Sequence, residues 1–105
     1  MIERLAAEIE DKYLLLTEEL ADPKVLRDQS HYAEISKAHS DLEESYRLAV
    51  AYRETLTLLQ EAESLLDEGG LDPEMKEFLV EEKIAARERL DELEQQLRLA
   101  VLEKD

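Results

Sequence analysis

The side chains that could do chemistry in this chain are two histidines, five serines, two adjacent glycines and many carboxylates. His31 and His39 lie eight positions apart, roughly 12 Å along a helix, which is too far for both to bind one metal ion. Gly69-Gly70 lacks the further glycines and the lysine of a phosphate-binding loop, and the serines lack the strand–turn–helix context of an exposed nucleophile. We therefore predict no catalytic, cofactor-binding or metal-binding residue and expect no enzyme activity.

The carboxylates dominate the charge of the chain. There are 28 acidic and 13 basic side chains, which gives a net charge of −15 with neutral histidine. Such an excess repels phosphates and argues against direct nucleic-acid binding. A carboxylic acid that donates protons in catalysis also needs an enclosing apolar pocket, which slender helices do not offer. The absence of cysteine excludes disulfides and zinc–thiolate sites.

Apolar residues recur every three or four positions, which predicts helices and no strands. Two breaks interrupt this pattern, at Asp22-Pro23 and at residues 67–73, which read DEGGLDP. At the second break a glycine with left-handed backbone suits the end of a helix, while Asp72 and Pro73 suit the start of the next one. We therefore expect three helices, at about residues 2–21, 30–67 and 73–102, in one domain spanning residues 1–105.

The predicted fold is all-α, with three antiparallel helices packed side by side in a coiled-coil-like bundle, because the apolar spacing averages near 3.5 residues. The helices would be roughly 30, 55 and 45 Å long. The first is expected to flank the N-terminal half of the second and the C-terminal half of the third. The second and third would then extend beyond it as a hairpin arm. The chain would leave at Asp105, beside the junction of the first two helices.

The tip of this arm is strongly acidic. Residues 61–82 contain nine acidic side chains and one basic one, Lys76. Such a run is most often a solvated face, but it would also complement a basic protein surface. The tip residues proposed for that contact are Glu68, Gly69, Gly70, Asp72 and Glu74.

A second apolar stripe on the middle helix provides the other candidate partner-binding residues, Leu58 and Leu65. Only one stripe can face the third helix directly, so these two leucines are expected to be partly exposed unless a partner or a second copy covers them. The alternative is that the third helix, with Met75 and Phe78, is broad enough to cover both stripes.

Several short motifs follow one another along the chain in a recognisable order. Residues 20–28 read LADPKVLRD, residues 31–37 read HYAEISK, and residues 72–77 read DPEMKE. This order resembles the N-terminal helical domain of bacterial class I peptide chain release factors, over essentially the whole chain. The type that reads UAA and UGA commonly has Trp after the first Asp-Pro-x-Val. Leu26 stands there in this chain, which therefore looks more like the type that reads UAA and UAG.

The resemblance implies a domain of a longer factor. The family's Gly-Gly-Gln loop for peptidyl-tRNA hydrolysis is missing, since Leu71 follows Gly69-Gly70, and so is the codon-reading loop. It further implies a cytoplasmic role in translation termination, with the ribosome near the stalk base as partner. The GTPase-type release factor is a second candidate partner, and no cofactor is implied. Glu103 departs from the family, which typically has proline there.

Two interpretations from other classes stay open. The chain could be a stand-alone structural coiled coil that self-associates through Leu48, Leu58 and Leu65, or an adaptor that uses the hairpin to hold a client. No apolar stretch approaches the roughly 18 residues of a membrane span, so no membrane contact is expected.

Overall fold

The structure, a computed structural model, describes residues 2–103, which form helices joined by short connections. Four helices follow one another along the chain: α1 (Ile2–Leu20), α2 (Pro23–Arg27), α3 (Gln29–Glu68) and α4 (Pro73–Glu103). No strand occurs within residues 2–103, so the prediction of an all-α fold is confirmed. None of the helices in this range is long and apolar enough to cross a membrane.

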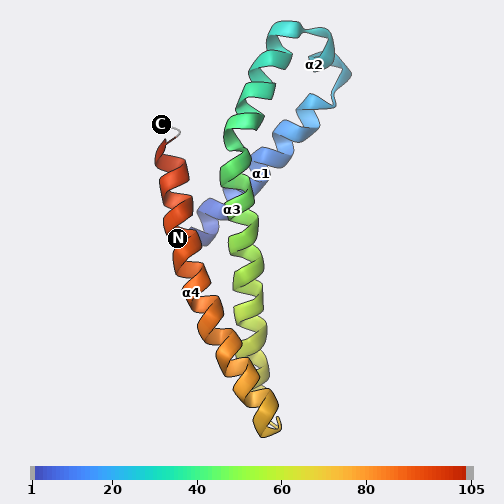
Figure 1. Ribbon diagram of the computed structural model, residues 1–105. Helices are drawn as coiled ribbons and strands as arrows, with labels where there is room; N and C mark the ends of the chain where they lie inside the picture. Colours follow the sequence, from blue (N-terminus) through green and yellow to red (C-terminus); the bar gives the residue numbers. More distant parts are fainter. Residues whose placement is uncertain (1, 104–105) are drawn as a thin grey trace.

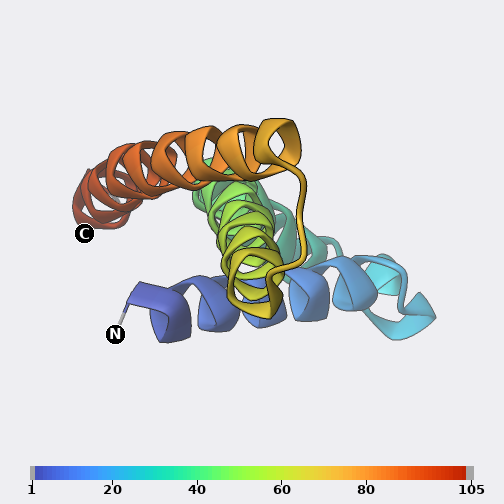
Figure 2. The same cartoon turned by 90° about the horizontal axis from the view of Figure 1, so that it is seen from below.

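The long helix α3 forms the axis of the molecule, and its 40 residues run along most of the 62 Å length. Helix α1 packs against its N-terminal half and α4 against its C-terminal half, both antiparallel to it (Figure 1). Seen from below, α1 and α4 lie on different sides of α3 (Figure 2). The lower parts of α3 and α4 therefore extend beyond α1 as the predicted hairpin arm.

The three long helices meet around the middle of α3. Ala49 and Tyr52 of α3 are buried there, and so are Ile9 of α1 and Leu93 and Leu97 of α4. Along α4 a stripe of apolar residues, mostly three or four positions apart, is buried throughout: Leu79, Ala86, Leu90, Leu93, Leu97 and Ala100. The near-3.5-residue spacing therefore identified this face correctly. Burial of several leucine-sized side chains, each worth about 1.5–3 kcal/mol, stabilises the meeting point.

The short helix α2 within the first break was not predicted. The Asp22 side chain accepts a hydrogen bond from the Lys24 N–H at 2.9 Å, and Pro23 occupies the first turn of α2. Val25, only 5% exposed, anchors α2 to the rest of the molecule. Asp28 then starts α3 by accepting from the His31 N–H at 3.1 Å. Five residues are too few to show a 3.6-residue period, so the sequence pattern gave no sign of this helix.

The second break has the predicted arrangement with one difference. Asp72 accepts a hydrogen bond from the Met75 N–H at 2.9 Å and so caps α4, as expected. Gly69 ends α3 with φ 73° and ψ −162°, which is a positive-φ conformation but not the left-handed helical one. Gly70 also has a positive φ, of 71°. Both values lie where L side chains are rarely found, which explains the pair of glycines.

The last described turns of α4 do not lie beside the junction of the first two long helices, where the chain was expected to leave (Figure 1). Asp105 itself lies outside the described residues, but Arg98 and Val101 near the end of α4 line a small pocket together with Leu5 near the start of α1. The junction between α1 and α3 lies at the far end of α1 (Figure 1). A second pocket is lined by Val101 of α4 together with Leu5, Ile9 and Lys12 of α1. The two helices therefore approach each other over the N-terminal part of α1 and the last turns of α4, on different sides of α3 (Figure 2).

Candidate protein-interaction site

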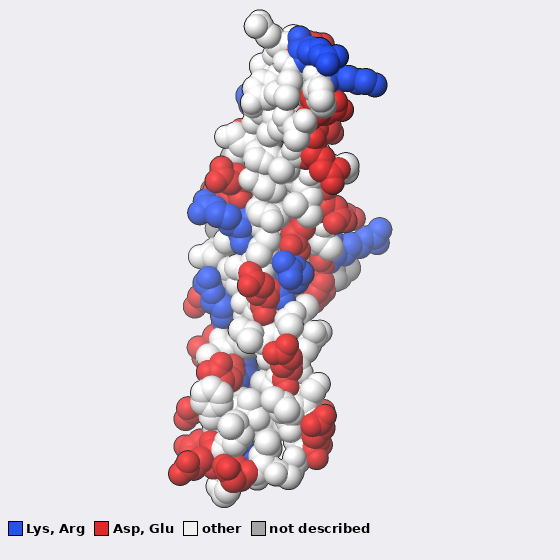
Figure 3. All heavy atoms as spheres, turned by 90° about the vertical axis from the view of Figure 1, so that its right-hand side faces the viewer, with Lys and Arg blue, Asp and Glu red and all other residues white. Residues whose placement is uncertain are grey.

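The predicted acidic tip lies at the end of the arm farthest from α1 and α2 (Figure 1). All five residues proposed there, from Glu68 to Glu74, are exposed. In the view of Figure 3 the charged side chains at the end of the arm are almost all acidic, whereas lysine and arginine side chains lie mainly over the middle and the opposite end of the molecule, among further acidic ones. None of the tip carboxylates is in an ion pair within residues 2–103. The tip therefore presents uncompensated negative charge to solvent.

An apolar groove runs along one side of the arm. Leu58 and Leu65 of α3 are 57% and 44% exposed, and Phe78 of α4 is 53% exposed. These side chains line a groove of about 460 Å³ between the two helices, together with Ala62 and Ala85. Helix α4 therefore leaves both leucines uncovered, although Ala62 between them is buried, and the expected exposure of Leu58 and Leu65 is confirmed.

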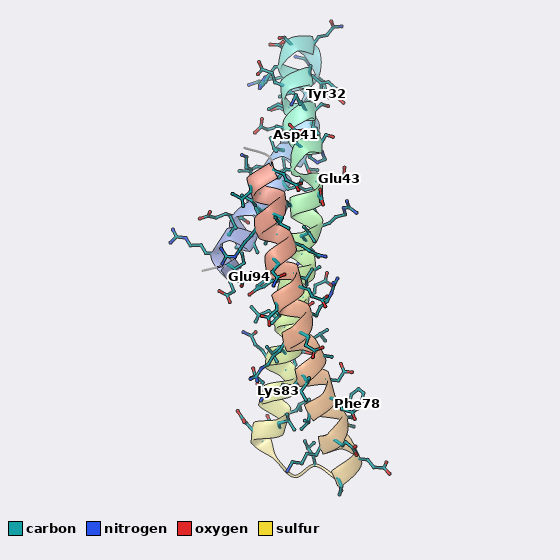
Figure 4. All side chains as sticks on the ribbon, turned by 60° about the vertical axis from the view of Figure 1, so that its left-hand side comes forward. Tyr32, Asp41, Glu43, Phe78, Lys83 and Glu94 are labelled. Carbon is teal, nitrogen blue, oxygen red and sulfur yellow. The ribbon has the colours of Figure 1, made fainter. Side chains whose placement is uncertain are left out.

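The opposite side of the arm is closed by charge pairs. One Glu63 oxygen lies 3.8 Å from the Lys83 Nζ and 3.1 Å from an Arg87 side-chain nitrogen, so both cations of α4 reach across to α3. Lys83 and Phe78 point to opposite sides of the hairpin in Figure 4. The arm thus has one polar side, bridged within the molecule, and one open apolar side.

The structure divides the predicted residues into two surfaces. Leu58 and Leu65 share the groove, but the tip residues from Glu68 to Glu74 do not line it. Asp72 in addition has a structural role as the cap of α4.

The prediction missed that Phe78, Glu82 and Ala85 complete the groove from α4. Their spacing of four and three residues forms a stripe next to the buried Leu79–Ala86 stripe, and that spacing could have revealed them.

His31 is exposed, and His39 takes part in the packing of α1 against α3. The His39 ring stacks on Tyr13 with centroids 4.2 Å apart, and its Nε2 lies 2.9 Å from the Thr17 hydroxyl oxygen. Tyr13 in turn stacks on Tyr46 at 4.0 Å, so these rings join α1 to α3. Among residues 2–103, no three histidine or carboxylate side chains converge in a way that would hold a metal ion.

Comparison with known proteins gives a consistent family assignment. The family model described as the PCRF domain matches residues 9–105. A protein named peptide chain release factor 1 from Exiguobacterium sp. is 40% identical over 105 residues, which is all of this chain and 29% of that relative. Proteins of the same name from Bacillus licheniformis and Lactococcus lactis subsp. cremoris are 37% and 36% identical, over 100% and 90% of this chain.

The chain spans less than a third of the length of these relatives, 29% and 26% for the latter two. No solved structure matches it significantly.

Proposed function

The chain belongs to the PCRF domain family, and from this membership we propose that it is the N-terminal domain of a release factor 1 that acts in translation termination in the cytoplasm. The relatives that carry this name align with the chain over 90% to 100% of its residues. We assign neither decoding nor peptide release to the chain itself, since it lacks the Gly-Gly-Gln sequence. The UAA/UAG type is preferred because Leu26 stands where the other type commonly has Trp.

Within that role the chain would position the factor on the ribosome near the stalk base. The observation that supports this is the acidic tip, which is exposed at the far end of the arm and has no intramolecular counter-ions among residues 2–103. Ribosomal proteins present basic surfaces, so such a tip would increase the association rate and fix the orientation by charge complementarity. The GTPase-type release factor is a second partner proposed for this surface.

A ribosome-binding experiment tests the role of the tip. The variant combines Glu68→Lys, Asp72→Asn and Glu74→Lys, where asparagine retains the cap of α4. The control combines Glu34→Lys, Glu43→Gln and Glu44→Lys, which changes the charge equally at exposed positions of α3 away from the arm. We expect binding to purified ribosomes, measured by co-sedimentation, to weaken about tenfold or more for the tip variant only, which corresponds to about 1.4 kcal/mol.

Salt dependence provides the decisive comparison. Raising the salt concentration from low to moderate should weaken ribosome binding by the unmodified chain, because salt screens exposed charges. The same change in salt should weaken binding by the tip variant much less. Equal binding of the tip variant and the unmodified chain at both salt concentrations would rule out the tip contact. The family role is tested separately, by grafting this chain in place of the matching segment of the Exiguobacterium relative and measuring stop-codon-dependent peptide release.

A further inference from the structure

The open groove of the arm has the features of a helix-binding site. Its apolar walls follow helical spacing on both sides, with Leu58 and Leu65 seven residues apart on α3 and Phe78 and Ala85 seven residues apart on α4. Seven residues correspond to roughly 10 Å along a helix, so the groove matches about two turns of a partner. An amphipathic helix binds in such a groove through side chains at positions i, i+3 or i+4, and i+7.

The rim of the groove indicates the charge of the partner. Glu61 of α3 and Glu82 of α4 line it from the two sides, and neither is in an ion pair within residues 2–103. The one cation in the lining, Arg89, lies 3.7 Å from a Glu92 oxygen of its own helix. Both walls of the groove therefore carry a carboxylate that is available to an incoming ammonium or guanidinium group.

From the apolar walls and the acidic rim we propose that this groove binds a cationic amphipathic helix of a protein partner. The apolar face of that helix would cover Leu58, Leu65 and Phe78, and its lysine or arginine side chains would pair with Glu61 and Glu82. The site is distinct from the acidic tip and goes beyond the role proposed for the tip.

Charge also argues against a second copy of this chain as the occupant. Pairing two arms through their grooves would bring together two segments of residues 61–82, each with a net charge of −8. Like charges held within a few ångströms oppose such an interface. A partner helix with positive charge would instead gain from the same carboxylates.

A synthetic peptide of about five helical turns, composed of leucine, alanine and lysine, tests the proposal without the ribosome. Its leucines lie at i, i+3, i+4 and i+7, and a second peptide has the same composition in an order without an apolar face. We expect the amphipathic peptide to bind the protein in fluorescence anisotropy and the scrambled peptide to bind about tenfold more weakly or worse. Equal binding of the two peptides would refute the proposal that the groove binds an amphipathic helix, because charge alone would then explain the binding.

Two pairs of variants locate the binding. Leu58→Ser with Phe78→Ser should weaken binding of the amphipathic peptide about tenfold or more, because each substitution removes apolar area that the bound peptide would bury. The control Leu14→Ser with Leu15→Ser changes leucines on α1 that are 51% and 58% exposed, and should leave binding unchanged. Circular dichroism verifies that each variant is folded.

Removing the two carboxylate charges at the rim of the groove tests separately how much charge pairing contributes to peptide binding. Glu61→Gln with Glu82→Gln should weaken binding about fivefold and reduce its salt dependence. Glu43→Gln with Glu44→Gln removes the same charge elsewhere on α3 and should have no such effect. The proposal fails if the groove variants bind the peptide as tightly as the unmodified protein. It also fails if sedimentation equilibrium shows a dimer that Leu58→Ser with Phe78→Ser dissociates, since the occupant would then be a second copy.

Discussion

Arg87 on α4 donates a hydrogen bond from a side-chain nitrogen to the Glu63 carboxylate on α3, across 3.1 Å. Lys83 approaches the same oxygen at 3.8 Å, so a single carboxylate bridges α3 to two turns of α4. This pairing lies on the side of the arm opposite Phe78 (Figure 4). The polar side of the arm is thus bridged within the molecule, while the apolar groove on the other side remains open to solvent.

Neutralising this bridge should loosen the arm. Glu63 is partly exposed, so Glu63→Gln is expected to cost only about 0.5 kcal/mol, within the range of solvent-screened ion pairs. Amide hydrogen exchange should become about twofold faster in the arm and stay unchanged where α1 packs on α3. Glu61→Gln, on the same helix but without an ion pair, is the matched control and should not accelerate exchange. Equal effects of the two variants would contradict a specific bridge.

Replacing Gly69 at the end of α3 by any L residue should destabilise the protein. Its φ of 73° and ψ of −162° belong to a region occupied almost only by glycine, although no atom lies within 4 Å of an added Cβ. Gly69→Ala is therefore expected to destabilise the arm by about 1–3 kcal/mol through backbone strain alone. Thermal unfolding and hydrogen exchange at the tip measure this loss. Ser64→Ala, at an exposed position within α3, should be neutral or slightly stabilising.

Removing the hydroxyl of Ser45 should stabilise the protein. Ser45 is 1% exposed, and its hydroxyl has no hydrogen-bond partner in the described structure. A buried polar group without a partner costs about 1–3 kcal/mol, so Ser45→Ala should raise the free energy of unfolding by about 1 kcal/mol. Urea unfolding checks this value. Ser40→Ala, which is exposed on the same helix, measures the gain from helix propensity alone and should be smaller.

Tyr52 should make the protein sensitive to alkaline pH. Burial raises the pKa of the Tyr52 hydroxyl to about 12, and the charge of Glu3, whose carboxylate accepts its hydrogen bond at 3.4 Å, adds to this. In the unfolded chain the pKa of tyrosine is about 10. Between these two pKa values the folded state binds the additional proton, so its stability is retained below about pH 10 and declines as the pH rises toward 12.

Chemical unfolding of Tyr52→Phe across this pH range tests the linkage. The variant should lose less stability than the unmodified protein between about pH 10 and 12, because phenylalanine has no proton to release. Tyr32→Phe, at an exposed tyrosine, is the control and should retain the decline of the unmodified protein. A decline of the same size in Tyr52→Phe would show that other groups cause the alkaline sensitivity.

The sequence determined those features that depend on neighbours along the chain. Repeats of three and four residues located the long helices and the buried face of α4, and Asp72-Pro73 identified the start of α4 correctly. Helix periodicity and capping involve residues within one or two turns, so they can be derived from spacing alone. The five residues of α2 contain too little of this periodicity to reveal a helix.

Tertiary structure alone decided how the helices are arranged around α3. Periodicity gives the apolar face of each helix but not the side from which a neighbour approaches, so it did not reveal that α1 and α4 lie on different sides of α3 (Figure 2). The same limit applies to the groove: Leu58 was a candidate from the sequence, but its pairing with Phe78 depends on the rotation of α4 about its own axis. That rotation is set by packing in the shared core, between residues distant in sequence.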